Sequence, residues 1–285
     1  MKIAITSVNG QLGTAIAKKL IQDLGKDNVI GIARTPEKAK HLGIEIRQGD
    51  YSNRQHFDEA LKGIDKLVLI SGMDEPHKRI QQHRNVIEAA KQNGVQKIVY
   101  TSIVGDENNT AFSPVVQSNR QTEEDVKNSG LEFVIGRNGI YIEPDLEYIA
   151  TYIKEEGISN CAADGKCAYT SREELGYAYA KMLVNDNLNG QTLILVGEAI
   201  TQTQLADCIN QVFGTTLIYT YVAFEEYKKE RQAALGDFIG NVIAGIYEGI
   251  SNGANDVASD YEKAAGRKHK STLKMIEDFH RIKSL

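Results

Sequence analysis

Short apolar runs alternate with longer amphipathic stretches up to about residue 141. Six of these runs have the length of strands and lack polar alternation: residues 3–5, 29–32, 44–46, 67–70, 98–100 and 133–135. Continuous apolar runs of this length are typical of parallel strands that are covered on both faces. The stretches between them are long enough for crossover helices. The pattern predicts an α/β fold with a Rossmann-like, doubly wound parallel sheet.

Helical patterns dominate after residue 141. They cover residues 145–156, 171–184, 203–213, 224–235 and 237–249, and strand-like runs at 192–196 and 217–221 interrupt them. No flexible linker separates the two parts of the chain. We therefore expect a Rossmann lobe over residues 1–141 and a smaller, mostly helical C-terminal lobe over 142–285, partly packed back on the sheet.

Helix starts support this reading. A Ser followed three residues later by Gln or Glu has the spacing of a capping box, and it occurs at Ser52, Ser118 and Ser171. Thr35 followed by Pro36 also predicts a helix N-terminus, because proline is tolerated in the first turn.

Composition narrows the class of protein. The chain has 285 residues, of which 41% are hydrophobic, and its 33 basic and 38 acidic side chains give a net charge of −5. This charge argues against nucleic acid or an anionic membrane as the partner. The three cysteines lack C-x-x-C spacing and the histidines lack metal-ligand spacing, so no disulfide framework and no metal are expected. The short apolar runs and the lack of a signal peptide predict a cytoplasmic protein.

The segment after the first predicted strand has the glycine spacing of a nucleotide-binding turn. Gly10 and Gly13 match the last two glycines of such a turn, and Ser7 stands where the first would be. Glycines here allow a tight turn and bring a pyrophosphate close to a helix N-terminus. The alternative is a tight turn without a ligand. The predicted contacts are Ser7, Asn9, Gly10, Gln11, Leu12 and Gly13.

Arg34 indicates which dinucleotide would bind. A cofactor without a 2′-phosphate usually meets an acidic residue at the end of the second strand, whereas this chain places Arg34 there. A guanidinium pairs well with a phosphate. The sequence therefore favours NADP(H) over NAD(H), with a surface arginine as the alternative.

Three further strand ends should border the same crevice, because ligands bind at the carboxyl ends of such sheets. Asp50 and Tyr51 are candidates for adenine contacts, and Thr101 should lie near the nicotinamide. The segment Ser71, Gly72 and Met73 offers backbone groups to ribose and phosphates.

The order and spacing of eight motifs resemble the NmrA-like group of atypical short-chain dehydrogenases/reductases. The motifs are NGQLG at 9–13, IARTPEKA at 32–39, GDY at 49–51, LISG at 69–72, QHRNVI at 82–87, YTS at 100–102, RNGIY at 137–141 and TQTQLA at 201–206. The resemblance is strongest to bacterial NAD(P)H:quinone oxidoreductases and triphenylmethane-dye reductases. It implies that Asn138, Gly139, Ile140 and Tyr141 also line the NADP(H) site. The family usually has glycine at position 7, so we expect the side chain of Ser7 to affect the affinity for the cofactor.

The expected catalytic helix lacks a proton-transfer pair. Most short-chain reductases of alcohols and ketones use Tyr-x-x-x-Lys, and no tyrosine occurs between Thr101 and Asn138, where this pair should lie. A reduced quinone leaves as a phenolate-like anion whose conjugate acid has a pKa of about 10, so it needs no dedicated acid. The sequence therefore predicts hydride transfer to a quinone-like or similar electrophilic acceptor, and no catalytic side chain is assigned.

The second lobe should supply an apolar substrate pocket. Its candidates, each with plain core packing as the alternative, are Met73, Phe112, Tyr141, Tyr148 and Tyr152. Arg172 is a further candidate, with a surface arginine in the first turn of a helix as the alternative. A second hypothesis is an NADP(H)-sensing regulatory protein without turnover, as some NmrA-like proteins are. A homodimer and a regulatory protein partner both remain open.

Overall fold

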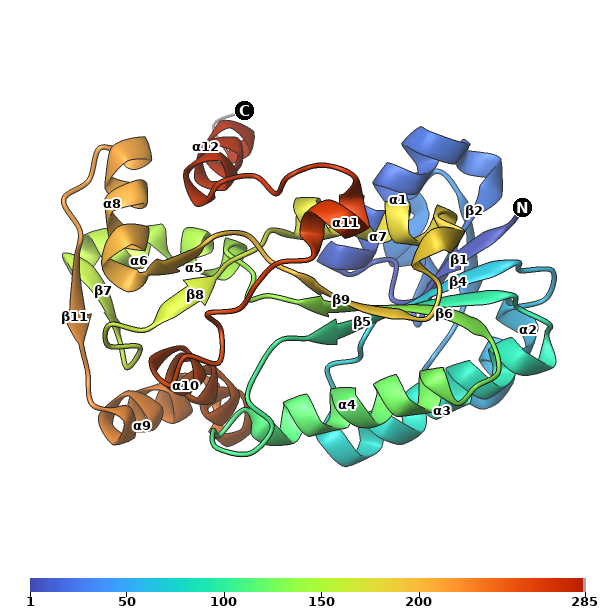
Figure 1. The fold of residues 1–285 in the computed structure, drawn as a ribbon, viewed down its shortest axis with the longest axis horizontal. Helices are drawn as coiled ribbons and strands as arrows, with labels where there is room; N and C mark the ends of the chain where they lie inside the picture. Colours follow the sequence, from blue (N-terminus) through green and yellow to red (C-terminus); the bar gives the residue numbers. More distant parts are fainter. Residues whose placement is uncertain (284–285) are drawn as a thin grey trace.

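A seven-stranded parallel sheet forms the centre of the larger lobe in the computed structural model, which describes residues 1–283 (Figure 1). Within that range the strand order is β3-β2-β1-β4-β5-β6-β9. The strands are β1 (Ile3–Ile5), β2 (Val29–Ala33), β3 (Glu45–Gln48), β4 (Lys66–Leu69), β5 (Lys97–Ile103), β6 (Glu132–Asn138) and β9 (Gln191–Leu195). The order reverses at β1 and β4, which creates the crevice where ligands bind in such sheets.

Helices cover both faces of this sheet, which confirms the doubly wound α/β fold (Figure 1). One face carries α1 (Gln11–Leu24), α7 (Arg172–Val184) and α11 (Tyr261–Ala265). The other carries α2 (Arg54–Ala60), α3 (Pro76–Gln92) and α4 (Ser113–Lys127). Short 3-10 helices, η1 (Lys26–Asn28), η2 (Pro36–Leu42) and η3 (Asp186–Leu188), lie in the connections.

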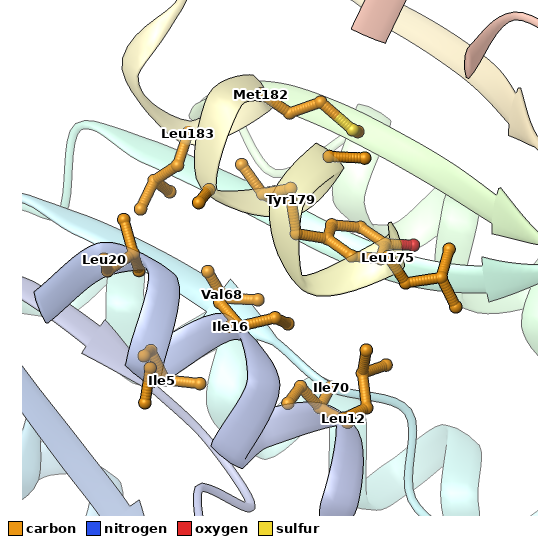
Figure 2. Close-up of a cluster of buried hydrophobic side chains, with 14 of the residues drawn as sticks. Ile5, Leu12, Ile16, Leu20, Val68, Ile70, Leu175, Tyr179, Met182 and Leu183 are labelled. Atoms are coloured by element: carbon orange, nitrogen blue, oxygen red, sulfur yellow. The ribbon is translucent and has the colours of Figure 1, made fainter. Parts of the chain in front are cut away.

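The packing of α1 against α7 shows why these segments are helical. On α1, Leu12, Ile16 and Leu20 recur every four residues and are buried on one face, toward side chains of the sheet and of α7 (Figure 2). Burying each such aliphatic side chain contributes about 1.5–3 kcal/mol. The two helices approach closely at Gly176, where a Cβ would lie 2.8 Å from the backbone of Ala15.

The smaller lobe lies beyond the carboxyl ends of β5, β6 and β9 (Figure 1). Its helices are α5 (Glu143–Glu147), α6 (Ile149–Lys154), α8 (Gln202–Phe213), α9 (Phe224–Leu235), α10 (Asp237–Ser251) and α12 (Thr272–Lys283). Strand β7 (Gly157–Asn160) pairs with β11 (Ile218–Tyr221), and β8 (Lys166–Ala168) with β10 (Ala199–Thr201). A separate apolar core that includes Ile142, Ile209 and Ile250 holds this lobe together. Among the described residues, no helix is long and apolar enough to cross a membrane.

Two of the three predicted capping boxes are wrong. The cap of α2 is Asn53, whose side chain accepts from the Gln55 N–H at 3.1 Å in place of Ser52. Ser118 lies inside α4, because that helix already begins at Ser113, with Pro114 in its first turn. The start at Ser171 is confirmed, since its hydroxyl accepts from the Glu174 N–H at 3.1 Å.

Candidate functional site

The turn after β1 is tight and is held directly against α1. Ser7 has a left-handed backbone with φ of 49°, and its carbonyl accepts from the Gly10 N–H at 2.9 Å. A Cβ at Gly13 would overlap the Ser7 carbonyl oxygen and lie 2.9 Å from Val8 Cα. Gly13 is therefore required for the helix to approach the turn. Ser7 adopts the conformation that a glycine would take more readily.

The first turn of α1 is open to an anion. Gly10 is its N-cap and supplies no side-chain hydrogen bond, and the first turn contains no acidic residue. Asn9, Gly10 and Gln11 are exposed, whereas Leu12 and Gly13 are buried. Exposed N–H groups and the positive end of the helix dipole favour a phosphate at this point.

Arg34 lies at the carboxyl end of β2, next to this turn. It is exposed and has no hydrogen bond or ion pair within the part of the chain that the structure describes. Asp50, after β3, is half-exposed and accepts from the Ser52 N–H at 2.9 Å. Arg34 is thus an unpaired cation at the edge where the sequence predicts a 2′-phosphate.

Tyr51 braces the loops instead of standing free beside them. Its hydroxyl lies 2.6 Å from both Thr6 Oγ1 and the Ile70 carbonyl, and it accepts from Ser7 Oγ at 3.1 Å. Burial raises the pKa of Tyr51 to about 12. Its ring stacks on Phe57 with centroids 5.6 Å apart. Tyr51 therefore joins the loops that follow β1, β3 and β4.

The segment after β4 is held through its backbone. The Ser71 N–H donates to Thr101 Oγ1 at 2.9 Å, and the Gly72 N–H donates to His83 Nε2 at the same distance. Thr101 lies within β5, which runs to Ile103 and so continues past the residues predicted to end it. Met73 is 84% exposed and packs into no pocket in this structure.

His83, which sequence reasoning did not single out as a site residue, is a buried neutral base behind this segment. Because Nε2 accepts from Gly72, Nδ1 carries the proton and donates to Thr122 Oγ1 at 2.9 Å. Burial, and secondarily the charge of Arg79, lower the pKa of His83 to about 3. Its neutral form positions the backbone of the crevice.

This burial predicts an acid-dependent loss of stability. The folded-state pKa of about 3 lies below the unfolded value of 6.5, so the contribution of His83 is complete above pH 6.5 and declines as pH falls toward 3. At pH 4.5 the loss should be about 2–3 kcal/mol. In urea unfolding, the His83→Gln variant should be less stable than the unsubstituted protein at neutral pH. Between pH 7 and 4.5, however, its free energy of unfolding should fall by about 2–3 kcal/mol less than that of the unsubstituted protein.

His77 is the matched control for this experiment. It lies on the same helix, α3, with a side chain that is 74% exposed. His77→Gln should keep the pH profile of the unsubstituted protein. A profile unchanged in His83→Gln would contradict the assignment.

At the end of β6, the amide oxygen and the amide nitrogen of Asn138 both form hydrogen bonds. Its Oδ1 accepts from the Tyr179 hydroxyl at 2.6 Å, and its Nδ2 donates to the Tyr141 hydroxyl at 3.0 Å. Gly139 packs so closely that a Cβ would lie 2.6 Å from the Ala168 carbonyl oxygen. Ile140 packs against the core of the smaller lobe. Asn138 therefore orients Tyr141 and connects the sheet to the start of that lobe.

Arg172 covers Tyr141 instead of lining a pocket with Tyr148. Its guanidinium carbon lies 5.4 Å from the centroid of the Tyr141 ring, and its backbone N–H donates to Glu143 Oε1 at 2.7 Å. The other oxygen, Oε2, has no hydrogen-bond partner but lies 4.0 Å from Arg172 Nη1, and burial raises the pKa of the Glu143 carboxyl. Glu143 is thus a site candidate that the sequence signalled only by its position after Tyr141.

A cavity of about 840 Å³ lies in the smaller lobe between α6, α9, α10 and β7. Its walls include the rings of Tyr148, Tyr152, Tyr227 and Tyr247. The structure therefore brings together Tyr148 and Tyr152 as predicted. Phe112, Tyr141, Arg172 and Met73 are not among its lining residues; Phe112 lies at the start of α4, in contact with α10 at Gly245.

A Tyr-x-x-x-Lys spacing does occur outside the predicted region, at Tyr177 and Lys181 on α7. Lys181 pairs with Asp23 at 3.1 Å, and its Nζ lies 5.5 Å from the centroid of the Tyr177 ring. Asp23 is in the last turn of α1, far along the helix from the open N-terminus. This pair therefore belongs to the α1–α7 surface. On α4, Asn119 accepts from Ser71 Oγ at 3.1 Å, so it binds the loop.

Comparisons with known proteins place the chain among NAD(P)H-binding oxidoreductases. The sequence profile of an NAD(P)H-binding family matches residues 8–183. Quinone oxidoreductase 2 of Escherichia coli is 32% identical over 247 residues, which cover 85% of each chain. An NmrA-like family domain-containing oxidoreductase of Aspergillus flavus is 30% identical over 235 residues, covering 80% of this chain and 76% of its own. The solved structure of Citrobacter triphenylmethane reductase with NADP(H) is 29% identical, with a TM-score of 0.88 over 96% of this chain and 100% of that one.

Proposed function

The chain belongs to the NAD(P)H-binding, NmrA-like family of oxidoreductases, and on this basis we propose that it passes a hydride from NADP(H) to a quinone-like or similar electrophilic acceptor. The observation that carries the proposal is the arrangement at the carboxyl edge of the sheet. There the open N-terminus of α1, the unpaired Arg34 and the segment from Asn138 to Tyr141 follow neighbouring or nearby strands. This is the edge at which doubly wound sheets bind dinucleotides.

Each part of this edge has a proposed role. The turn from Ser7 to Gly13 receives the pyrophosphate, and Arg34 pairs with the 2′-phosphate. Ser71 and Gly72 line the ribose side, with Asp50 toward the adenine. Tyr141 and Thr101 border the nicotinamide, which supplies the hydride when the cofactor is bound.

The residues present suit an acceptor that needs no protein acid. Helix α4 carries Asn119 against the Ser71 loop, and its amide oxygen already accepts from the hydroxyls of Ser71 and Tyr100. An amide in this position cannot donate a proton as a tyrosine hydroxyl would. A quinone is reduced to an anion whose conjugate acid has a pKa of about 10, so water can protonate it after release. Catalysis then consists of positioning the acceptor over the nicotinamide.

Two relatives support this substrate class. One is named for quinone reduction and the other for triphenylmethane reduction, and quinones and triphenylmethane dyes are both conjugated electrophiles. We place the acceptor beside Tyr141 and Thr101, at the carboxyl edge of the sheet, because hydride transfer requires contact with the nicotinamide.

The direct test is to measure NADPH binding and NADPH oxidation on one preparation. Small quinones, a triphenylmethane dye and enones would each be offered as acceptors, and the loss of NADPH absorbance would be compared with the non-enzymatic rate. We expect turnover with quinones and dye. NADPH binding without turnover on any acceptor would overturn the reductase and favour an NADP(H)-sensing regulatory protein.

A further inference from the structure

Four of the residues that line the 840 Å³ cavity are tyrosines, and the hydroxyl groups of two of them are already engaged. Tyr152 and Tyr247 both donate to Asp145 Oδ1, at 2.8 and 3.1 Å. Asp145 itself is only 5% exposed and is not a lining residue. Tyr227 meets Tyr247 edge to face, with centroids 5.5 Å apart. The cavity therefore offers ring surfaces, and its volume is that of a typical small-molecule site.

Arg231 is the cation of this cavity and has no anionic partner. Its guanidinium carbon lies 5.3 Å from the centroid of the Tyr227 ring, and its Nε is buried without a hydrogen-bond partner. Within residues 1–283 it forms no ion pair. Several other arginines each hold a carboxylate, namely Arg84, Arg120, Arg137 and Arg267. A half-buried guanidinium without such a partner is unfavourable unless something else satisfies it.

The two carboxylates that line the cavity do not pair with Arg231. Glu155 and Glu230 line the cavity, but both are exposed, and no ion pair joins either of them to Arg231. Exposed charges are hydrated and screened by salt, whereas a half-buried charge acts strongly on a group in contact with it. Arg231 therefore dominates recognition inside the cavity.

We propose that this cavity binds a planar aromatic ligand that carries a carboxylate or sulfonate, with its ring among the tyrosines and its anionic group on Arg231. A guanidinium can hold such a group through two parallel hydrogen bonds. The inference goes beyond the proposed function, because none of the residues that line this cavity belongs to the carboxyl edge of the sheet. It predicts binding selectivity independently of hydride transfer.

A non-reducible pair of probes tests the inference without turnover. 2-Naphthoate and 2-naphthamide share one ring system and differ in charge, and their dissociation constants can be measured by calorimetry. We expect the protein to bind the naphthoate about tenfold or more tightly than the amide, as a charge-assisted hydrogen bond implies. Arg231→Gln should abolish this preference. Lys228→Gln is the matched control on the same helix, because Lys228 stacks on Phe224 and does not line the cavity.

Two further variants keep the test decisive if Arg231→Gln unfolds. Arg231→Lys should retain a preference for the naphthoate, and Glu230→Gln should strengthen it by removing a negative charge from the cavity. Equal affinity for both probes in the unsubstituted protein, or a preference that survives in Arg231→Gln, would overturn the inference. If the unsubstituted protein preferred the naphthoate but reduced no quinone, only the proposed reductase activity would be contradicted.

Discussion

Replacing Arg34 with alanine is expected to weaken NADPH binding about ten- to a hundredfold and to leave NADH binding nearly unchanged, since charged hydrogen bonds are worth about 1.5–3 kcal/mol. The guanidinium is exposed at the end of β2 and has no partner among the described residues, so it is available to a 2′-phosphate. NADH lacks that phosphate and has nothing to lose. Titration of the two dinucleotides followed by fluorescence or calorimetry gives both constants.

Lys26 provides the control for Arg34. It is an exposed cation just before β2, at the opposite edge of the sheet. Lys26→Ala removes the same charge from the protein and should leave both affinities unchanged. If the two substitutions weakened NADPH binding equally, only the net charge of the protein would matter. An unchanged NADPH affinity in Arg34→Ala would remove Arg34 from the site.

Replacing Gly13 with alanine is expected to impair binding of NADPH and NADH alike by more than tenfold and to destabilise the fold by about 1–3 kcal/mol, the usual range for overpacking. The added methyl would overlap the Ser7 carbonyl oxygen and crowd Val8 Cα at 2.9 Å. Both contacts are backbone, so no side chain can rotate away. The turn must move off α1, which displaces the N–H groups proposed to receive the pyrophosphate. Urea unfolding and dinucleotide titration measure the two effects.

Gly10→Ala is a milder substitution with which Gly13→Ala can be compared. A Cβ at Gly10 would approach the same Ser7 oxygen only to 3.2 Å, and the residue is exposed at the N-cap of α1. We expect a smaller loss of stability and of affinity than for Gly13→Ala. A Gly13 variant with the affinity and stability of the unsubstituted protein would show that close packing of the turn on α1 is not required.

Most of the sheet was predictable because its strands are buried on both faces. The runs at 3–5, 29–32, 67–70, 98–100 and 133–135 coincide with strands, with ends shifted by up to three residues. The small strands β7, β8 and β10 were missed because none of them contains a continuous run of three apolar residues. The run at 192–196 was predicted as a strand, but its place at the edge of the main sheet beside β6 depends on tertiary pairing.

The candidate site was predictable to the extent that it follows strand ends. The glycine turn, Arg34 and the segment from Asn138 to Tyr141 are all at the expected edge. The contacts that hold this edge were not predictable. The hydroxyl of Tyr51 between Thr6 and Ile70, and His83 behind Gly72, join residues that are 11 to 45 positions apart in the chain. No local pattern marks such pairs.

The sequence by itself determined the parallel α/β fold and the edge of the sheet where a dinucleotide is expected, because strand burial and turn glycines are read from neighbouring residues. Only the tertiary structure decided which side chains are free to act. It engages Asn138 and Tyr51 in internal hydrogen bonds. It leaves the guanidinium groups of Arg34 and Arg231 without an ion-pair partner among the described residues. The physical reason is that a charged or polar group acts on a ligand only when nothing else satisfies it, and its partners come from distant parts of the chain.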